Sequence, residues 1–271
     1  MPELPEVEVL ARELHVKICG LRVSRVVMYQ HSLRTLPPQG FEAKIHGKKI
    51  FSVSRRGKYL EISLEDKTSL WFHLGMTGQL IWSTQPLEDE HLHCRIEFKE
   101  ALTCLYFRDV RRFGQIYLTH GSSDTWPAAL LSLGPDPFKL SNDAFTCLLS
   151  RRQGRIKSLL MNQKLLSGLG NIYADECLFR SGIDPRKRAR RLTQKRLTRL
   201  HRAICETLKE AIQKGGSSID DFRHLKGEKG SFQDDHSVYG RKGKPCFHCR
   251  SLIRRVRLAG RSSHFCPHCQ T

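Results

Sequence analysis

The first six residues, Met1-Pro2-Glu3-Leu4-Pro5-Glu6, place a potential nucleophile beside two carboxylates. If Met1 is removed, Pro2 carries a free secondary amine, and a terminal amine titrates near ~7.7–8.0 against roughly 10.4 for lysine. Part of it is unprotonated at neutral pH and can attack a carbonyl carbon, which gives a charged iminium that acts as an electron sink. Many chains begin with Met-Pro, however, and acidic residues also favour a helix start. Taken alone, the stretch therefore favours the ordinary interpretation, and the rest of the chain must decide.

A second group of reactive side chains lies at the far end of the sequence. Two Cys-x2-Cys pairs are separated by 16 residues and comprise Cys246, Cys249, Cys266 and Cys269. This spacing is typical of a structural site in which four thiolates hold one Zn2+ in a tetrahedron. A tail of this length cannot fold by core burial alone, so metal binding would fold it. We expect the three histidines among these cysteines to be non-ligands; a pair of disulfides is the alternative.

The charge of the chain indicates a polyanionic partner. The 271 residues contain 46 Lys and Arg against 27 Asp and Glu, a net charge of +19. Nucleic acid is the default partner for such an excess, with an anionic membrane surface as the competing possibility. We find no apolar run near the ~20 residues of a spanning helix and no secretory signal pattern. The sequence therefore predicts a cytoplasmic protein without a membrane segment.

The basic residues are concentrated in one stretch. Between Arg186 and Arg202 there are nine Lys or Arg and no acid. A solvated helix face would normally mix signs. Charge alone, however, indicates only a phosphate attraction that does not depend on base sequence.

Hydrophobic periodicity predicts the elements that must position these groups. Apolar residues spaced as in an amphipathic helix occupy residues 4–14, and short alternating strands fill residues 21–118, as in an antiparallel sandwich or barrel. A Gly- and Pro-containing linker follows at 133–137. The pattern is then helical from about 141 to 223, with an interruption at Gly215–Ser218. Residues 226–238 are polar, and we expect a mobile loop there.

Three further motifs could contact nucleic acid. The glycines before Asn171 predict a helix start with Asn171 as its N-cap, which suits a phosphate, although an ordinary helix connection is equally compatible. The segment Arg108–Gly114 places cations beside Phe113, which could wedge into a base stack. In His73–Gly78, Met76 lies between glycines, either at an exposed turn or in the core.

Seven blocks occur in the order seen in formamidopyrimidine-DNA glycosylases, and the sequence resembles a full-length member of that family. They are Pro2–Glu8, Arg55–Leu60, His73–Gly78, Arg111–Gly114, Gly168–Glu176, Val238–Gly243 and the four cysteines. The related endonuclease VIII branch usually has Gly at the position of Leu4, so Leu4 favours the formamidopyrimidine branch. The resemblance implies an α+β fold in three parts. These are a β-sandwich with flanking helices over residues 1–133, a helix–two-turn–helix domain with the lesion-recognition loop over 134–235, and a zinc finger over 236–271.

The resemblance also implies an activity: excision of oxidised purines, chiefly 8-oxoguanine and formamidopyrimidines, followed by β,δ-elimination at the abasic site. The partner would be double-stranded DNA containing oxidised bases or abasic sites, bound by a monomer whose only cofactor is one structural Zn2+. The implied catalytic residues are Pro2 as nucleophile, Glu3 as proton donor, Glu6 as a supporting carboxylate, Lys58 as the acid of β-elimination and Arg261 for δ-elimination. The implied DNA contacts are His73, Met76, His91, Arg111, Phe113, Arg152, Lys157 and Asn171.

The sequence departs from the pattern of this family at two positions, and two other classes of protein are alternatives. The family commonly has Pro at the position of Val110 and a different small residue at that of Gly57. Neither change removes a reacting group, although both could alter loop rigidity.

If Met1 is retained, the same surface would belong to a catalytically silent damage-binding protein. The other alternative is an unrelated zinc-ribbon protein that binds nucleic acid, but this alternative does not explain the grouping of Pro2, Glu3 and Lys58.

Overall fold

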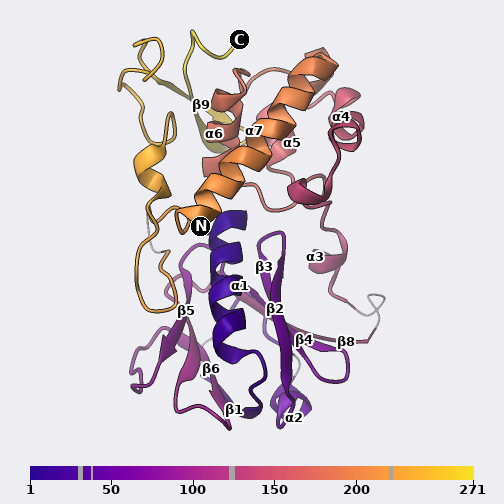
Figure 1. The fold of residues 1–271 in the computed structure, drawn as a ribbon, viewed down its shortest axis with the longest axis vertical. Coiled ribbons are helices and arrows are strands. Elements are labelled where there is room, and N and C mark those ends of the chain that lie inside the picture. Colours follow the sequence, from indigo (N-terminus) through magenta and orange to yellow (C-terminus); the bar gives the residue numbers. More distant parts are fainter. Residues whose placement is uncertain (30–32, 38, 122–125, 220–221) are drawn as a thin grey trace. The chain divides into compact units, whose positions relative to one another are not determined.

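The protein consists of two compact units, described by a computed structural model of residues 1–271 except 30–32, 38, 122–125 and 220–221 (Figure 1). The first unit contains residues 1–131 together with 214–231, and the second contains 132–213 together with 232–271. The chain therefore returns to the first unit after the long helix of the second. Among the described residues, no helix is both long and apolar enough to cross a membrane.

The first unit is a β-sandwich of two antiparallel four-stranded sheets, as the α+β prediction requires. One sheet has the order β1 (Val23–Met28), β6 (Leu92–Phe98), β7 (Cys104–Asp109), β5 (Gly78–Ser83). The other has the order β2 (Ile50–Arg56), β3 (Tyr59–Leu64), β4 (Thr68–His73), β8 (Gln115–His120). Alternating apolar residues of both sheets, such as Leu60, Ile62 and Ile96, meet in one core.

Helices cover the edges of this sandwich. Helix α1 (Leu4–Ile18) extends four residues past the predicted helix and packs its apolar face on β2 and β3. Two short helices complete the unit, α2 (Phe41–Ile45) and α3 (Ala128–Leu131). The buried residues Val7, Leu10 and Leu14 of α1 belong to the same core as the strands, so the helix start is fixed against the sheet.

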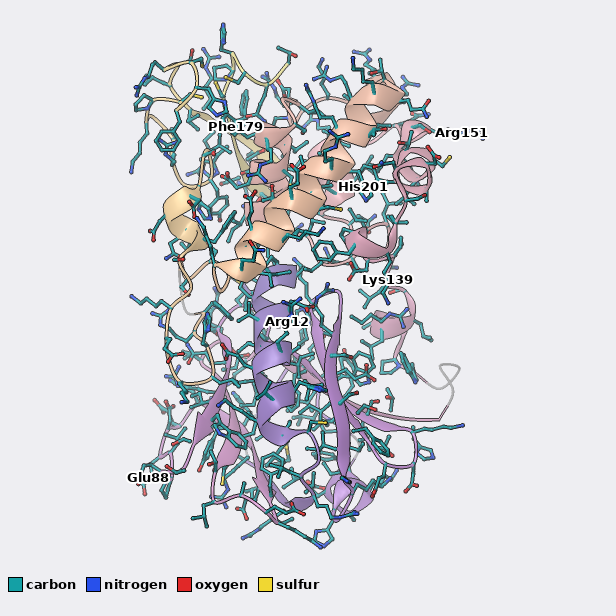
Figure 2. All side chains as sticks on the ribbon, in the orientation of Figure 1. Arg12, Glu88, Lys139, Arg151, Phe179 and His201 are labelled. Carbon is teal, nitrogen blue, oxygen red and sulfur yellow. The ribbon has the colours of Figure 1, made fainter. Side chains whose placement is uncertain are left out.

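The second unit is helical and ends in a two-stranded hairpin. Its helices are η2 (Pro137–Lys139), α4 (Asn142–Ser150), α5 (Ile156–Leu160), α6 (Asn171–Arg180), η3 (Ala189–Arg191), α7 (Gln194–Gln213) and η4 (Phe232–Asp235), followed by strands β9 (Arg254–Leu258) and β10 (Arg261–Phe265). His201 of α7, labelled in Figure 2, stacks on Phe145 of α4 with ring centroids 4.7 Å apart. The linker predicted at 133–137 is confirmed as a break between helices.

Two predictions in this region need correction. The helical pattern ends at Gln213 and not near residue 223, because Gly215 and Gly216 adopt φ of 73° and 79°. The segment predicted as a loop at 226–238 contains η4, whose Phe232 is buried with its ring 5.6 Å from that of Tyr173. Part of that segment is therefore a packed element of the second unit.

The conformation of Gly216 yields a stability prediction. A Cβ at this position would lie 2.8 Å from Oε1 of Glu6, in addition to the cost of a left-handed backbone. We expect Gly216→Ala to lower the free energy of unfolding by about 2–4 kcal/mol, since it strains φ and displaces a buried hydrogen-bonded carboxylate. Urea unfolding measures the change.

Gly47→Ala is the matched control, because Gly47 has φ of 74° and an added methyl group there would meet nothing within 4 Å. It should cost only roughly 1–2 kcal/mol. Equal losses for the two variants would show that the contact with Glu6 is unimportant for stability.

Candidate active site and metal centre

The N-terminal segment is held inside the first unit by a capping box. Pro2 is buried, and Glu3 is the N-cap of α1 with 2 % of its surface exposed. The backbone N–H of Glu3 donates to Oε2 of Glu6 at 2.8 Å, and the Glu3 side chain accepts from the first turn in return. Pro5 fits this turn because a proline there removes no helical hydrogen bond. The arrangement fixes Pro2 beside two buried carboxylates.

Glu6 also connects this turn to a distant part of the chain. Its Oε1 accepts the backbone N–H of Ser217 at 2.8 Å, and its side chain is 1 % exposed. Both carboxylate oxygens are thus occupied by backbone donors. Glu6 is a positioning residue here, since its oxygens tie the start of α1 to the Gly215–Ser217 turn.

Lys58 lies in the two-residue turn of the β2–β3 hairpin. Gly57 has φ of 59°, which the first central position of such a turn requires and glycine provides. Three residues before Lys58, Nε of Arg55 is 2.7 Å from Oε2 of Glu8, a half-buried ion pair that joins the hairpin to α1. In Figure 1 the tip of this hairpin lies near the N-terminal end of α1. The Lys58 side chain is mostly buried.

His73 lies on the neighbouring strand, where burial favours its neutral form. Tyr59 and His73 are register partners, with ring centroids 4.7 Å apart. Burial, then the positive charges of Lys58 and Arg34, lower the pKa of His73 to about 4. The backbone N–H of Gly75 donates to Nδ1 at 3.1 Å, so the ring proton resides on Nε2. His73 can therefore offer an uncharged N–H to a phosphate.

Met76, Arg111 and Phe113 come together from two loops. Met76 and Phe113 are exposed large apolar residues, and the Arg111 guanidinium lies 5.0 Å from the centre of the Phe113 ring. The two loops touch at Gly75, where an added Cβ would be 2.7 Å from the carbonyl carbon of Phe113. Exposed apolar side chains on adjoining loops, one of them beside a cation, suit insertion into a base stack.

Asp109 organises both of these loops, and the sequence interpretation assigned it no role. This fully buried carboxylate accepts hydrogen bonds from the Thr77 hydroxyl and from the Gly114 N–H at 2.6 Å. Its backbone N–H donates to the carbonyl of His91 at 2.9 Å, so His91 joins the same cluster. The signal available in the sequence was a single acid inside the cationic run Arg108–Arg112.

In the second unit, Lys157 is buried. Its Nζ lies 2.7 Å from Oδ1 of Asp175 and donates to the carbonyl of Ser262 at 2.7 Å. Asp175 also accepts from the Ser263 hydroxyl at 3.0 Å and from the His264 N–H at 2.8 Å. The network therefore holds α5 and α6 against strand β10, whose first residue is the exposed Arg261.

Asn171 and Arg152 occupy two other places in this unit. Asn171 is the first residue of α6 and Gly170 is the N-cap, so the prediction of an Asn171 cap is wrong. Gly170 directly precedes the helix, and no side chain caps the first turn. The Oδ1 atom of Asn171 is buried and has no hydrogen-bond partner among the described residues. Arg152 is exposed just after α4. Both remain predicted DNA contacts.

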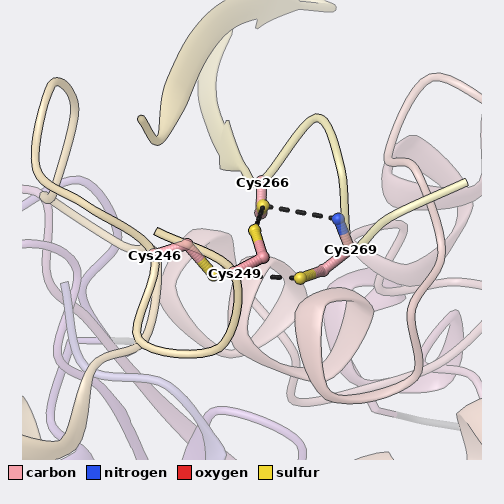
Figure 3. Close-up of side chains that lie close together, drawn as sticks. All are labelled: Cys246, Cys249, Cys266 and Cys269. Atoms are coloured by element: carbon pink, nitrogen blue, oxygen red, sulfur yellow. Dashed lines mark hydrogen bonds between the residues drawn. The ribbon is translucent and has the colours of Figure 1, made fainter. Parts of the chain in front are cut away.

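The four cysteines of the tail form one metal centre (Figure 3). Their sulfur atoms all lie within 4.8 Å of one another, with 3.9 Å between Cys246 and Cys269 and 3.4 Å between Cys249 and Cys266. A tetrahedron of Zn–S bonds of about 2.3 Å needs similar spacings. Hydrogen bonds from Ser251 lower the pKa of the Cys249 thiol to about 6, whereas burial raises the pKa of Cys266. Four thiolates this close together repel one another, so a cation is needed to keep all four sulfurs ionised, which fits zinc.

Comparison with known proteins agrees with this architecture in all three parts. Residues 1–116 match the formamidopyrimidine-DNA glycosylase N-terminal domain, residues 133–223 its H2TH domain, and residues 243–271 a zinc finger found in FPG and IleRS. This chain belongs to the formamidopyrimidine-DNA glycosylase family. It is accordingly a member of a family of DNA-repair glycosylases, and its four clustered cysteines form the structural zinc site of the finger.

Individual relatives cover the whole chain. The formamidopyrimidine-DNA glycosylase of Solibacter usitatus is 43 % identical over 271 residues, 100 % of this chain and 99 % of the relative. A Lactococcus lactis FPG mutant, solved with DNA containing Fapy-dG, aligns with a TM-score of 0.90 at 36 % identity over 100 % of both chains. The FPG protein from Thermus thermophilus aligns with a TM-score of 0.88 at 38 % identity, over 99 % of this chain and 98 % of that one.

The state of His73 can be tested by titration. Because its pKa is lowered to about 4, we expect the ring to stay neutral down to about pH 5, with the exposed His46 as the reference signal. A buried base held neutral leaves the fold at full stability above its ordinary pKa of 6.5, and stability is lost progressively as the pH falls from 6.5 to about 4. NMR of the imidazole nitrogens measures the protonation of His73 directly. A His73 that gains its proton near pH 6.5 would contradict the prediction.

Loss of one cysteine ligand should unfold the metal centre. We expect Cys249→Ser to lose most of its bound zinc, to expose the β9–β10 hairpin to protease and to bind DNA at least tenfold more weakly. Cys147→Ser is the control, because Cys147 is an exposed free thiol on α4. Metal analysis, proteolysis and a binding titration provide the readouts. Unchanged DNA affinity in a zinc-free sample would contradict this prediction, because DNA binding would then not depend on the metal-folded finger.

Proposed function

We propose that the protein excises oxidised purines from double-stranded DNA and then cleaves the strand, with Pro2 as the nucleophile. Removal of Met1 frees the Pro2 amine, which attacks C1′ of an extruded nucleotide while the bond from C1′ to the base breaks. The observation that carries this proposal is the buried carboxylate of Glu3 directly after a buried Pro2. A carboxyl group within reach of the sugar supplies the proton that opens its ring.

Elimination reactions follow from the same intermediate. Ring opening places a positively charged iminium between Pro2 and C1′, and this electron sink acidifies the proton on C2′. Loss of that proton expels the 3′ phosphate, and a second elimination expels the 5′ phosphate. Lys58 fits the acid of the first elimination, and Arg261 fits the group that binds phosphate and assists the second. The burial of Lys58 and the exposure of Arg261 agree with these roles.

The exposed loop residues support extrusion of the damaged nucleotide. Unstacking a base costs a few kcal/mol, and a damaged pair lowers that cost. Met76, Arg111 and Phe113 offer an apolar surface and one cation, which can fill the gap that the nucleotide leaves. His73, His91, Arg152, Lys157 and Asn171 are proposed to contact the flanking DNA. Solved relatives were captured with DNA containing Fapy-dG or an abasic site, which supports the same substrate class here.

Borohydride trapping tests the covalent intermediate. With a duplex containing 8-oxoguanine opposite cytosine, we expect a protein–DNA species whose cross-linked peptide begins at Pro2. Glu3→Gln should trap about 10²–10⁴-fold more slowly, because the ring-opening proton is missing. A version with an N-terminal extension before Pro2 should bind DNA and give no trapped species.

Two results would contradict this mechanism. One is strand cleavage by the wild-type protein without any trapped species, and the other is trapping on a lysine instead of Pro2. Intact mass identifies the catalytically silent alternative, because such a protein would keep Met1.

A further inference from the structure

The cationic run between Arg186 and Arg202 forms a connected surface on the second unit, which none of the proposed catalytic steps uses. On α7, Lys195, Arg199 and Arg202 are spaced by four and three residues, so they share one exposed face. The opposite face, with Leu197, Leu200 and Ile204, is buried. Lys195 and Arg202 are separated by about 10 Å along the helix at 1.5 Å per residue.

Two open depressions lie along this surface. The first, about 560 Å3, is lined by Lys195, Arg196, Arg199 and Arg202 together with Thr271 and two uncharged α7 residues. The second, about 580 Å3, is lined by Arg155, Asp184, Arg186, Lys187, Arg188 and Arg191. They adjoin each other, since the N–H of Asp184 donates to the main-chain oxygen of Thr271 at 3.5 Å. We call these residues the α7 basic strip.

The charge of the α7 basic strip is poorly neutralised. Its one acid, Asp184, is 2.5 Å from Nη2 of Arg186. Apart from Arg186 and Arg196, seven of its cations form no ion pair within the described part of the chain: Arg155, Lys187, Arg188, Arg191, Lys195, Arg199 and Arg202. The guanidinium of Arg196 is held instead by the carbonyl of Gly182 at 3.0 Å and by Thr271. Burial, then the neighbouring charge of Arg199, lowers the pKa of Arg196.

The α7 basic strip is continuous with a segment already proposed to contact DNA. The N–H of Arg190 donates to the carbonyl of Arg152 at 2.9 Å, and the N–H of Ile156 donates to that of Lys187 at 2.7 Å. Arg155 and Arg188 form an antiparallel bridge between the same two segments. Cations therefore occur on each segment from Arg152 to the first turns of α7.

We propose that the α7 basic strip binds the phosphate backbone of duplex DNA beyond the lesion-binding site. This inference rests on the proposed function, because it takes duplex DNA as the ligand. A length of about 10 Å on α7, laid along the DNA axis, covers roughly three phosphates of one strand, at 3.4 Å of helix axis per phosphate. No exposed large apolar residue lies between 152 and 202 in the described chain, whereas a membrane-bound helix needs an apolar face in the lipid. Phosphate binding without base contacts fits a surface of this composition.

The test compares two variants with the same loss of charge. In the strip variant, Lys195, Arg199 and Arg202 are all changed to Gln, which is a good helix former. In the control variant, the exposed Lys44, Lys49 and Lys99 of the first unit are changed to Gln. Undamaged duplexes of about one and about four helical turns, at 10–10.5 base pairs per turn, are titrated over a range of salt concentrations.

The strip variant should bind the long duplex roughly tenfold or more weakly, and the slope of log K against log salt should fall by about 2–3. Its binding of the short duplex and its thermal unfolding should stay near wild type. Equal losses in the control variant would overturn the proposal, because net charge alone would explain them. Equal losses on both duplexes would also overturn it. So would a third result, in which anionic vesicles bind the wild type but not the strip variant and both proteins bind DNA equally well.

A separate readout keeps this inference apart from the catalytic proposal. Borohydride trapping on a lesion in the short duplex should be the same for wild type and the strip variant. If wild type gives no trapped species, the catalytic proposal fails while the salt slopes still decide whether the α7 basic strip binds DNA.

Discussion

The Glu6 carboxylate lies 2.8 Å from the N–H of Glu3 and 2.8 Å from that of Ser217, two residues more than 200 positions apart. A buried carboxylate is costly unless it is hydrogen-bonded, so these two donors must stay in place for the first unit to be stable. The position of Pro2 depends on that constraint, because the turn after it is the one that Glu6 fixes. The glycines at 215 and 216 are needed for the same reason, since a methyl group at 216 would occupy the space of the carboxylate.

Buried carboxylates that accept hydrogen bonds also hold other loops of this strongly basic chain. Asp109 holds the two loops that present Met76 and Phe113, and Asp175 holds Lys157 against strand β10. Glu176 accepts three backbone N–H groups at 237–239, although burial still raises its pKa. In each case an acid satisfies donors that would otherwise be buried without partners. These buried acids thus position loops of the chain.

The sequence predicted those features that depend on local pattern. Apolar spacing at 4–14 predicted α1, alternation predicted the strands from 21 to 118, and the two Cys-x2-Cys pairs predicted the zinc centre. What it could not supply depends on contacts between distant residues. The return of residues 214–231 to the first unit depends on contacts such as the Glu6–Ser217 bond and the packing of Leu225 in the core, which no periodicity encodes. Asn171 was misplaced by one residue because glycine, which usually ends helices, is here the cap.

Lys157 shows how burial alters a role that is carried over from a resemblance. An exposed lysine contacts phosphate as a mobile point charge, but Lys157 is buried and uses its Nζ to bind Asp175 and the carbonyl of Ser262. Since Ser262 directly follows Arg261, the contacts of Lys157 help to hold the strand that carries the proposed δ-elimination residue in place. Removing either charge would leave the other buried and unpaired, which is far more costly than losing a surface contact. We therefore propose that Lys157 affects DNA binding partly through the orientation of the β9–β10 hairpin.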